Sequence, residues 1–228
     1  MPGGAMSQQK MLTSENALML VGAGPVAVAD LHQFAPLVDG VIALDGGAEA
    51  VLEAGLKPLA VIGDLDSLSS PARAAFGAVL HRVEEQDTTD FEKALARVAA
   101  PRLLALGLTA GRLDHGFAAL NALARHPRRR IVVLGPEDAT VLLPPDGLAL
   151  DLPPGLRLSL LPMGRAMVTA EGLVWPLEGA VLEPAGAISA SNAVGPGGRV
   201  RIGAVGPLLV TLERAAVPAL WRALAPAR

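Results

Sequence analysis

The stretch PLAVIGDLDS, residues 58–67, joins a short apolar run to a pair of aspartates. The run predicts a buried strand, and Gly63 and Ser67 favour a tight turn after it. Asp64 and Asp66 are two residues apart, so such a turn can direct both carboxylates into one pocket. Mg²⁺ prefers oxygen ligands and is usually held by one or two carboxylates together with substrate phosphates. The stretch therefore predicts an α/β fold with a phosphate-binding metal site at a strand end.

Other acidic residues follow apolar runs in the same way. QDTTD spans residues 86–90, Asp114 lies in TAGRLDHG, and Asp45 lies in LDGGA. Open α/β sheets bind ligands outside the carboxyl ends of their strands, so these residues are expected to converge. Each has a simpler interpretation when taken alone, because Asp87 and Asp90 could only cap a helix. Their repetition favours a shared site.

The first half of the chain alternates apolar runs with helical segments, which is typical of βαβ units. Ser70-Pro71 predicts the start of a helix that runs to about residue 78. A capping box at Thr89–Glu92 predicts another helix, continuing through Phe91, Leu95 and Val98. A third helix is expected over 113–125, with Leu113, Phe117, Leu120 and Ala124 on one apolar face. The predicted strands are 17–21, 40–44, 59–62, 79–83, 102–106 and 131–134.

After Pro144 the pattern changes, because prolines and glycines interrupt every few residues. Short apolar runs separated by turn residues predict a small sandwich or barrel. These runs are 156–161, 166–170, 180–182, 187–190, 199–205 and 208–212. We therefore expect a loose tail over 1–15, an α/β nucleotide-binding domain with a mainly parallel sheet over 16–143, and a smaller all-β sandwich domain over 147–228.

Composition excludes several classes of protein. The net charge of −3 and pI of about 5.8 give no basic field for nucleic acid. The absence of cysteine excludes disulfides, thiolate catalysis and Cys-ligated zinc, and the four histidines lack the spacing of a catalytic zinc site.

The apolar stretch 17–29 imitates a secretory signal, but Gly22, Gly24 and Pro25 interrupt it. No run reaches the ~18 apolar residues of a membrane span, so a cytoplasmic protein without membrane contact is expected.

The phosphate-binding groups are not those of a common nucleotide motif. No Walker loop is present, and Gly22-Ala23-Gly24-Pro25 is only a fragment of a dinucleotide fingerprint. Arg112 could bind a phosphate with its planar fork of donors, or could pair with Asp114 at the surface. Lys93 could contact a phosphate, or could be a solvated helix lysine. Metal and carboxylates are therefore expected to hold the phosphates.

Six blocks occur in order between Asp45 and Asn192: LDGGA, GDLDS, QDTTDFEKAL, TAGRLDHGFAALNAL, EGLVWPL and ISASNAVG. Together this series resembles the thiamine pyrophosphokinase family. The resemblance implies transfer of the pyrophosphoryl group of ATP to thiamine, giving thiamine diphosphate and AMP, with Mg²⁺. It also implies an α/β nucleotide domain followed by a β-sandwich, and a homodimer that holds thiamine where two subunits meet.

The resemblance also implies roles for individual residues. The catalytic and metal-binding positions would be Asp64, Asp66, Asp87 and Asp90. The ATP side would include Asp45, Gln86, Thr89, Lys93, Arg112, Asp114 and His115. The thiamine side would include Ser191, Asn192 and Trp175. Two positions depart from the family pattern: Ala110 replaces the first of two glycines before the arginine, and Ala193 replaces an acidic residue after Ser-Asn.

Two other classes of protein fit part of the sequence. A metal-dependent transferase of nucleotide sugars would use GDLDS to hold its substrate, but it leaves QDTTD unexplained. A non-catalytic regulator that binds nucleotide or thiamine would keep the fold without the metal, and the intact acidic blocks argue against it.

Overall fold

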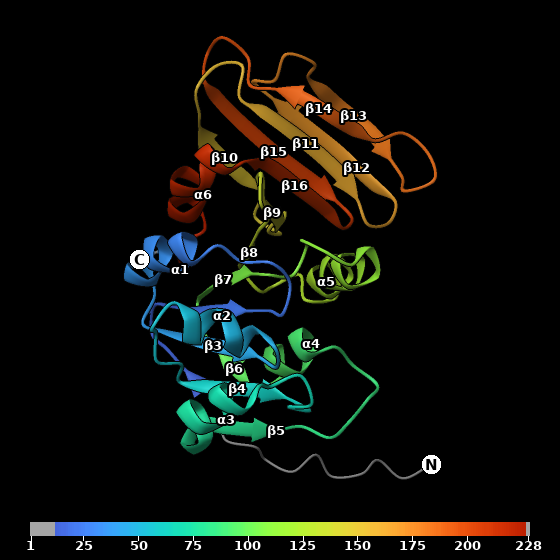
Figure 1. Cartoon of the computed structure of the whole chain (residues 1–228). Coiled ribbons are helices and arrows are strands. Elements are labelled where there is room, and N and C mark those ends of the chain that lie inside the picture. The colour runs from blue at the N-terminus through green and yellow to red at the C-terminus, as the bar shows by residue number, and fades with distance from the viewer. Residues whose placement is uncertain (1–11, 227–228) are drawn as a thin grey trace, which may run out of the picture.

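A ten-stranded mixed sheet runs through both halves of the chain in this computed structural model, which describes residues 12–226 (Figure 1). Its strand order is β14-β11-β16-β9-β8-β7-β2-β3-β4-β5. The six strands from β8 to β5 are parallel to their neighbours within that group. They are β2 (Ala17–Val21), β3 (Gly40–Leu44), β4 (Ala60–Gly63), β5 (Leu80–Arg82), β7 (Arg102–Leu106) and β8 (Ile131–Leu134).

Helices cover both faces of this parallel part, which is why its central strands are apolar throughout. Met19 and Val21 of β2 face one core with α1, α2 and α3, whereas Leu18 and Leu20 face the other with α4 and α5. The bounds are α1 (Val28–Phe34), α2 (Gly47–Glu53), α3 (Ser70–Phe76), α4 (Asp90–Leu95) and α5 (Leu113–Arg125), with 3₁₀ turns at Ala35–Leu37 and Gly77–Val79.

The second half of the chain forms a sandwich on the same sheet. β9 (Asp138–Leu142), β16 (Leu208–Glu213), β11 (Arg157–Pro162) and β14 (Ser189–Ala193) extend the sheet in antiparallel fashion. A separate four-stranded antiparallel sheet has the order β10-β15-β12-β13. Its strands are β10 (Leu148–Asp151), β15 (Arg199–Val205), β12 (Ala166–Glu171) and β13 (Leu177–Leu182). Leu158 and Val210 of the large sheet share one core with Val168 and Ile202 of the small one.

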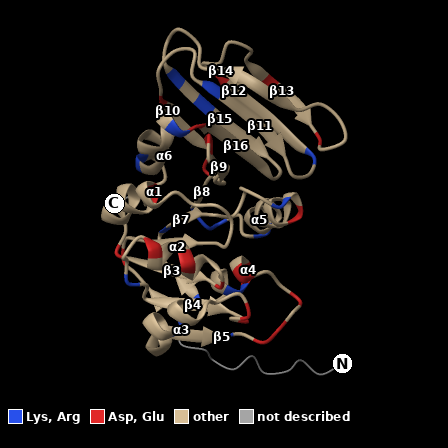
Figure 2. Cartoon of the chain, in the orientation of Figure 1, with Lys and Arg blue, Asp and Glu red and all other residues tan. Residues whose placement is uncertain are grey.

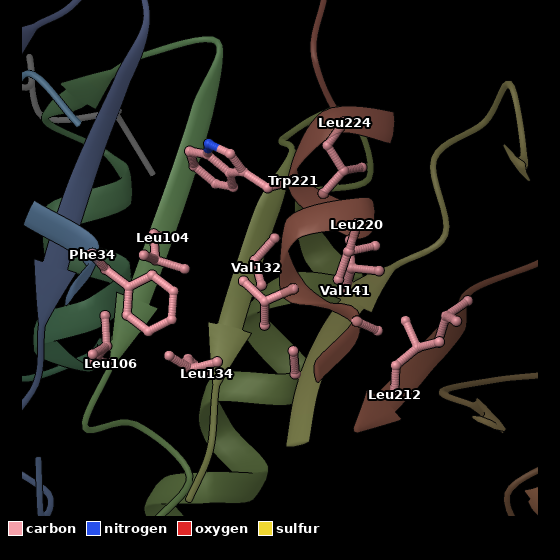
Figure 3. Close-up of a cluster of buried hydrophobic side chains, with 14 of the residues drawn as sticks. Phe34, Leu104, Leu106, Val132, Leu134, Val141, Leu212, Leu220, Trp221 and Leu224 are labelled. Atoms are coloured by element: carbon pink, nitrogen blue, oxygen red, sulfur yellow. The ribbon is translucent and has the colours of Figure 1, made fainter. Parts of the chain in front are cut away.

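The C-terminal helix α6 (Val217–Ala223) follows a 3₁₀ turn at Arg214–Ala216 and packs against this same core. Figure 3 shows Leu220, Trp221 and Leu224 of this helical segment beside Val132 and Val141 of β8 and β9. The Arg102 guanidinium lies 4.5 Å from the Trp221 ring centroid, and its Nη1 donates to the Trp221 carbonyl at 2.8 Å. Arg102 therefore connects the start of β7 to helix α6.

Three expectations for individual elements are wrong. Val98 does not continue helix α4, because β6 (Val98–Ala99) pairs with β1 (Leu12–Thr13) instead, which also removes residues 12 and 13 from the expected loose tail. Residues 1–11 of that tail lie outside the described residues. The expected apolar face of α5 is buried only in part, since Leu120 and Ala124 pack against the core whereas Leu113 is 87% exposed and Phe117 61% exposed. The helix buries Gly116, Ala119, Ala122 and Leu123, whose small side chains let it lie close to the sheet.

The two halves also do not have separate sheets. β9, which the sequence pattern did not predict, pairs with β8 on one side and β16 on the other. The large sheet is therefore mixed, and hydrogen bonds cross from the parallel part into the antiparallel part. The division into domains near residues 144–147 stays a prediction.

Candidate active site

A cavity of about 590 Å³ opens at the carboxyl ends of the parallel strands. Turns after β2, β3, β4 and β7 form its walls, together with the first residues of α4 and α5. Eight predicted site residues line it: Asp45, Asp64, Gln86, Thr89, Asp90, Lys93, Arg112 and His115. The other predicted residues lie elsewhere: Asp66, Asp87, Asp114, Trp175, Ser191 and Asn192.

The two acidic turns after β3 and β4 are in direct contact. The Asp45 N–H donates to the Ile62 carbonyl at 2.9 Å, and a Cβ added at Gly63 would lie 2.7 Å from the Asp45 Cβ. Only glycine at position 63 lets the turns approach this closely. Asp45 has a φ of 42° and Leu65 a φ of 67°, so both turns contain a non-glycine residue in the left-handed region.

Three carboxylates share this part of the cavity. Asp45 is 5% exposed, and its Oδ1 has no hydrogen-bond partner among the described residues. Burial raises the pKa of Asp90; Lys93 opposes this effect, and the nearby charges of Asp45 and Asp64 add to it. The pKa of Asp64 is lowered, because its carboxylate accepts hydrogen bonds from the Asp66 N–H at 3.1 Å and from Gln86 at 3.4 Å. Figure 2 shows acidic residues on α2, at the start of α4 and along the loop between β5 and α4.

Asp66 and Asp87 do not join the other aspartates as expected. Leu65 buries its side chain and turns the chain between Asp64 and Asp66, which leaves Asp66 exposed. Asp87 is exposed in the loop before α4, where its N–H donates to Glu85 at 3.1 Å. Within residues 12–226, no three acidic or histidine side chains are arranged as a metal site. The unpartnered Oδ1 of Asp45 beside Asp64 nevertheless fits Mg²⁺, which needs only one or two carboxylates when phosphates supply other ligands.

The start of α4 is built as the sequence predicts. The Thr89 hydroxyl accepts from the Glu92 N–H at 3.3 Å, and the Glu92 carboxylate accepts from the Thr89 N–H at 3.4 Å, which completes the capping box. Lys93 is not a solvated lysine, since it is 3% exposed and its Nζ lies 3.0 Å from Asp90 Oδ1. Removing an ammonium from water is costly, and Asp90 offsets this cost through its charge and its hydrogen bond. Lys93 also lines the cavity, so its ammonium lies beside the space that an anion would occupy.

Arg112 and His115 also line the cavity, at the start of α5. Asp114 does not line it but binds the Arg112 guanidinium, with 3.1 Å between Nε and Oδ1. This pairing lowers the pKa of Asp114, and both side chains are largely exposed. The surface pairing of Arg112 with Asp114 is therefore present, and Arg112 also lines the cavity, so its binding of a phosphate stays a prediction. Ala110 also lines the cavity, followed by Gly111 with a φ of 101°.

The residues predicted for thiamine lie on the sandwich. Asn192 is 3% exposed and binds the chain around Trp175: its Nδ2 donates to the Trp175 carbonyl at 2.7 Å, and its Oδ1 accepts from the Trp175 N–H at 3.2 Å and the Ala193 N–H at 2.8 Å. Trp175 is 61% exposed. Ser191 has a φ of 57°, and its N–H donates to Ser159 Oγ at 3.0 Å. Asn192 therefore holds Trp175 in place and has little capacity left for a ligand.

The sequence pattern gave too little weight to the glycine turn at 22–25. Gly22, Ala23, Gly24 and Pro25 all line the cavity, beside Gly107. A Cβ added at Gly22 would lie 2.6 Å from the Gly107 carbonyl oxygen. The signal that could have identified this turn is its position directly after β2, which lies among the central strands of the large sheet.

Comparisons with known proteins agree with this layout. The family model described as "Thiamin pyrophosphokinase, catalytic domain" matches residues 31–134, and the model described as "Thiamin pyrophosphokinase, vitamin B1 binding domain" matches residues 151–209. The chain belongs to the thiamin pyrophosphokinase family. The two matched segments together span well over half of the chain.

Individual relatives support this assignment. The chain is 31% identical to Thiamine pyrophosphokinase 1 of Arabidopsis thaliana over 157 residues, which cover 60% of this chain and 59% of that protein. It is 29% identical to Thiamine pyrophosphokinase 1 of Oryza sativa subsp. japonica over 202 residues, covering 72% of this chain and 76% of the relative. The alignment with the Arabidopsis protein thus spans less than two thirds of that relative.

Solved structures show the same fold. Thiamin pyrophosphokinase from Candida albicans superposes with a TM-score of 0.76 at 15% identity, covering 91% of this chain and 95% of that one. Thiamin pyrophosphokinase from Geobacillus thermodenitrificans gives a TM-score of 0.72 at 24% identity, covering 86% of this chain and 96% of the other. Among the described residues, no helix has both the length and the apolar character needed to cross a membrane.

Proposed function

We propose that this chain is a thiamine pyrophosphokinase, which transfers the pyrophosphoryl group of ATP to the hydroxyl of thiamine and releases AMP. The observation that carries the proposal is the buried Asp45, which lines a cavity together with Asp64 and Asp90 and whose Oδ1 has no hydrogen-bond partner among the described residues. Such a set of oxygens suits a magnesium–triphosphate complex. Family membership supplies the acceptor class.

In this proposal, Asp45 and Asp64 hold Mg²⁺, which neutralises charge on the phosphate oxygens when bound. The Lys93 ammonium and the Arg112 guanidinium bind phosphate oxygens on two sides of the cavity. Asp90 accepts the proton of the thiamine hydroxyl as that oxygen attacks the β-phosphorus and the bond to the α-phosphate oxygen breaks. A carboxylate whose pKa burial raises is better suited to accept a proton than an exposed one.

The remaining predicted residues of the α/β half have supporting roles in this proposal: Asp66, Asp87, Gln86, Thr89, Asp114 and His115. Gln86 donates to Asp64, Thr89 caps α4, and Asp114 orients Arg112. His115 lines the cavity next to Arg112. Asp66 and Asp87 are exposed in the loops before α3 and α4, next in the chain to residues that line the cavity.

We further propose a homodimer in which the sandwich of one copy completes the cavity of the other. Ser191, Asn192 and Trp175 line no part of the cavity in their own chain, whereas Trp175 exposes a large aromatic surface. Leu113 and Phe117, next to Arg112, are also exposed and would be covered by a second copy. Residues 16–143 would then form the catalytic domain and 147–228 the thiamine-binding domain of a cytoplasmic enzyme.

Measurement of AMP from ATP, Mg²⁺ and thiamine tests the activity. We expect AMP only when thiamine is present, and a loss of about 100-fold or more in Asp64→Asn. Arg165→Ala serves as a control, because Arg165 forms an exposed ion pair with Glu183 in the sandwich, 2.7 Å apart. Binding of ATP or thiamine without any AMP would instead indicate a regulator, and turnover of a nucleotide sugar would indicate the other transferase class.

Mixing two inactive variants tests the shared site. Asp64→Asn removes an acidic ligand, and Trp175→Ala removes the sandwich contribution, so each homodimer would be impaired. If each site uses both subunits, refolding the two variants together restores activity in mixed dimers that contain one intact site. No restoration, with dimers confirmed by light scattering, would show that each chain builds its site alone.

A further inference from the structure

Arg73 of α3 binds the backbone of the turn that carries Asp64. Its Nη2 donates to the carbonyl of Leu65, the residue with a φ of 67° between the two aspartates of GDLDS. A leucine in this left-handed conformation is strained by about 1–3 kcal/mol and persists only where its surroundings hold it. The buried Leu65 side chain holds the turn from one side, and Arg73 holds it from the other.

A second link fixes α3 itself to the neighbouring acidic turn. Glu49, in the first turn of α2, accepts hydrogen bonds from the Ser69 N–H at 2.8 Å and the Ser69 hydroxyl at 2.9 Å. Ser69 is the N-cap of α3 and accepts from the Ala72 N–H at 3.2 Å. Helix α2 begins two residues after Asp45. Glu49 therefore connects the Asp45 turn to α3, and Arg73 connects α3 to the Asp64 turn.

We propose that Arg73 and Glu49 are positioning residues, which set the separation of the Asp45 and Asp64 carboxylates for the ligand they share. Neither residue lines the cavity, so both act through the turns and not by contact with substrate. The inference rests on the proposed function for its ligand, a divalent cation bound to a nucleoside triphosphate. The positioning itself depends only on the contacts of Leu65 and Ser69.

Arg73→Ala is the decisive variant, because Arg73 is exposed and its removal leaves no cavity in the core. We expect the Mg²⁺ concentration for half-maximal AMP formation to rise about 10- to 100-fold, as for other residues that orient metal ligands. The KM for thiamine should change less than about twofold. Methylguanidinium in the buffer should restore part of the lost activity, because it supplies an N–H donor for the Leu65 carbonyl.

Two measurements do not depend on turnover. Hydrogen exchange of the Asp66 amide, which donates to Asp64 Oδ1, should become faster in Arg73→Ala and in Glu49→Ala. Electron paramagnetic resonance of Mn²⁺ in the presence of ATP should show weaker binding in both variants. Arg165→Ala should match the parent protein in every measurement.

Unchanged Asp66 exchange and unchanged Mn²⁺ binding in Arg73→Ala would overturn the positioning role. A parent protein that forms no AMP would overturn the proposed function. In that case, faster Asp66 exchange in the variants would still support Arg73 and Glu49 as the residues that hold the turn.

Discussion

Backbone strain at single residues coincides with the candidate site. In residues 12–226, the non-glycine residues with positive φ are Asp45, Leu65 and Ser191. Each lies in a segment with predicted site residues: LDGGA, GDLDS and ISASNAVG. Such conformations persist where the surrounding structure fixes them, and they concentrate at functional sites. This coincidence is consistent with the proposal that the sandwich segment serves the same site as the two acidic turns.

At Asn192, substitution by alanine should weaken thiamine binding indirectly. The change removes the partners of the Trp175 N–H and carbonyl and of the Ala193 N–H, so Trp175 loses its fixed position. We expect the KM for thiamine to rise more than the KM for ATP, and the free energy of unfolding to fall by about 1–3 kcal/mol. Steady-state kinetics and urea denaturation measure the two effects. An equal rise in both KM values would contradict a role on the thiamine side alone.

Asp138, at the start of β9, should make stability depend on pH. Burial raises the pKa of this carboxyl above its unfolded value, so its contribution to stability is present below the unfolded pKa and is lost as pH rises through the folded pKa. The stability of the parent relative to Asp138→Asn should therefore decrease between about pH 3 and neutral pH. Urea denaturation of both proteins across this range provides the measurement. A relative stability that increases with pH would show that the carboxylate is favoured in the folded state.

Among the elements, helix α5 exposes two large apolar residues and buries mainly small ones. Its residues Leu113 and Phe117 are exposed, while its buried residues are Gly116, Ala119, Ala122 and Leu123. The sequence pattern suggested a neighbouring face that includes Leu120 and Ala124, because large apolar side chains usually mark the core side of a helix. Here the close approach of the helix to the sheet favours small residues instead.

Two substitutions on α5 should therefore differ sharply. Phe117→Ser should change the unfolding free energy of an isolated monomer by no more than about 0.5 kcal/mol, as expected for a surface site. Leu123→Ala should lower it by about 2–5 kcal/mol, because Leu123 is 1% exposed. Thermal or urea denaturation of dilute protein compares them. A large loss in Phe117→Ser would reveal that a partner chain covers Phe117 under those conditions.

Much of the element order could be predicted from the sequence, for identifiable reasons. The strands β2, β3, β7 and β8 are continuous apolar runs of parallel sheet, and their predicted limits are confirmed. Helices α1 and α2 have only seven residues each, too few to show a helical period. Strand β9 was missed because Thr140 interrupts its apolar pattern. That threonine is buried, with its hydroxyl 3.0 Å from that of Thr211 on β16.

The site shows the same limits. Asp45, Asp64 and Asp90 could be found because each follows a strand or begins a helix, where parallel sheets bind ligands. The burial of Lys93 and the divergence of Asp66 could not, since both depend on how the loop and α4 pack. Arg73 carries no motif at all, and only its contact with Leu65 reveals it.

The whole molecule is organised around one sheet that both halves share. β9 pairs with β8 and with β16, so the core of the sandwich and the core of the parallel part meet at the same strands. Arg102 and Arg130 add hydrogen bonds from the parallel part to carbonyls of the C-terminal segment. The structure therefore predicts that the halves depend on each other for stability.

This dependence can be measured by unfolding and by truncation. Tryptophan fluorescence, which reports Trp175 and Trp221, and far-ultraviolet circular dichroism should show one coincident urea transition. A fragment of residues 1–147 should be far less stable than the full chain, since β9 would lose its pairing with β16 and expose a sheet edge. Two separate transitions, or a stably folded fragment, would instead support independent domains.

The shared sheet also restricts how substrates can enter and leave. A clamshell motion of the two halves would have to break a backbone ladder next to β9, with either β8 or β16, so no hinge is available there. Opening and closing must come from segments without such pairing, above all the exposed loop of residues 84–88 between β5 and α4, which carries Gln86 and Asp87. We therefore expect the movement of this small loop, and not of the two halves, to limit the rate of turnover.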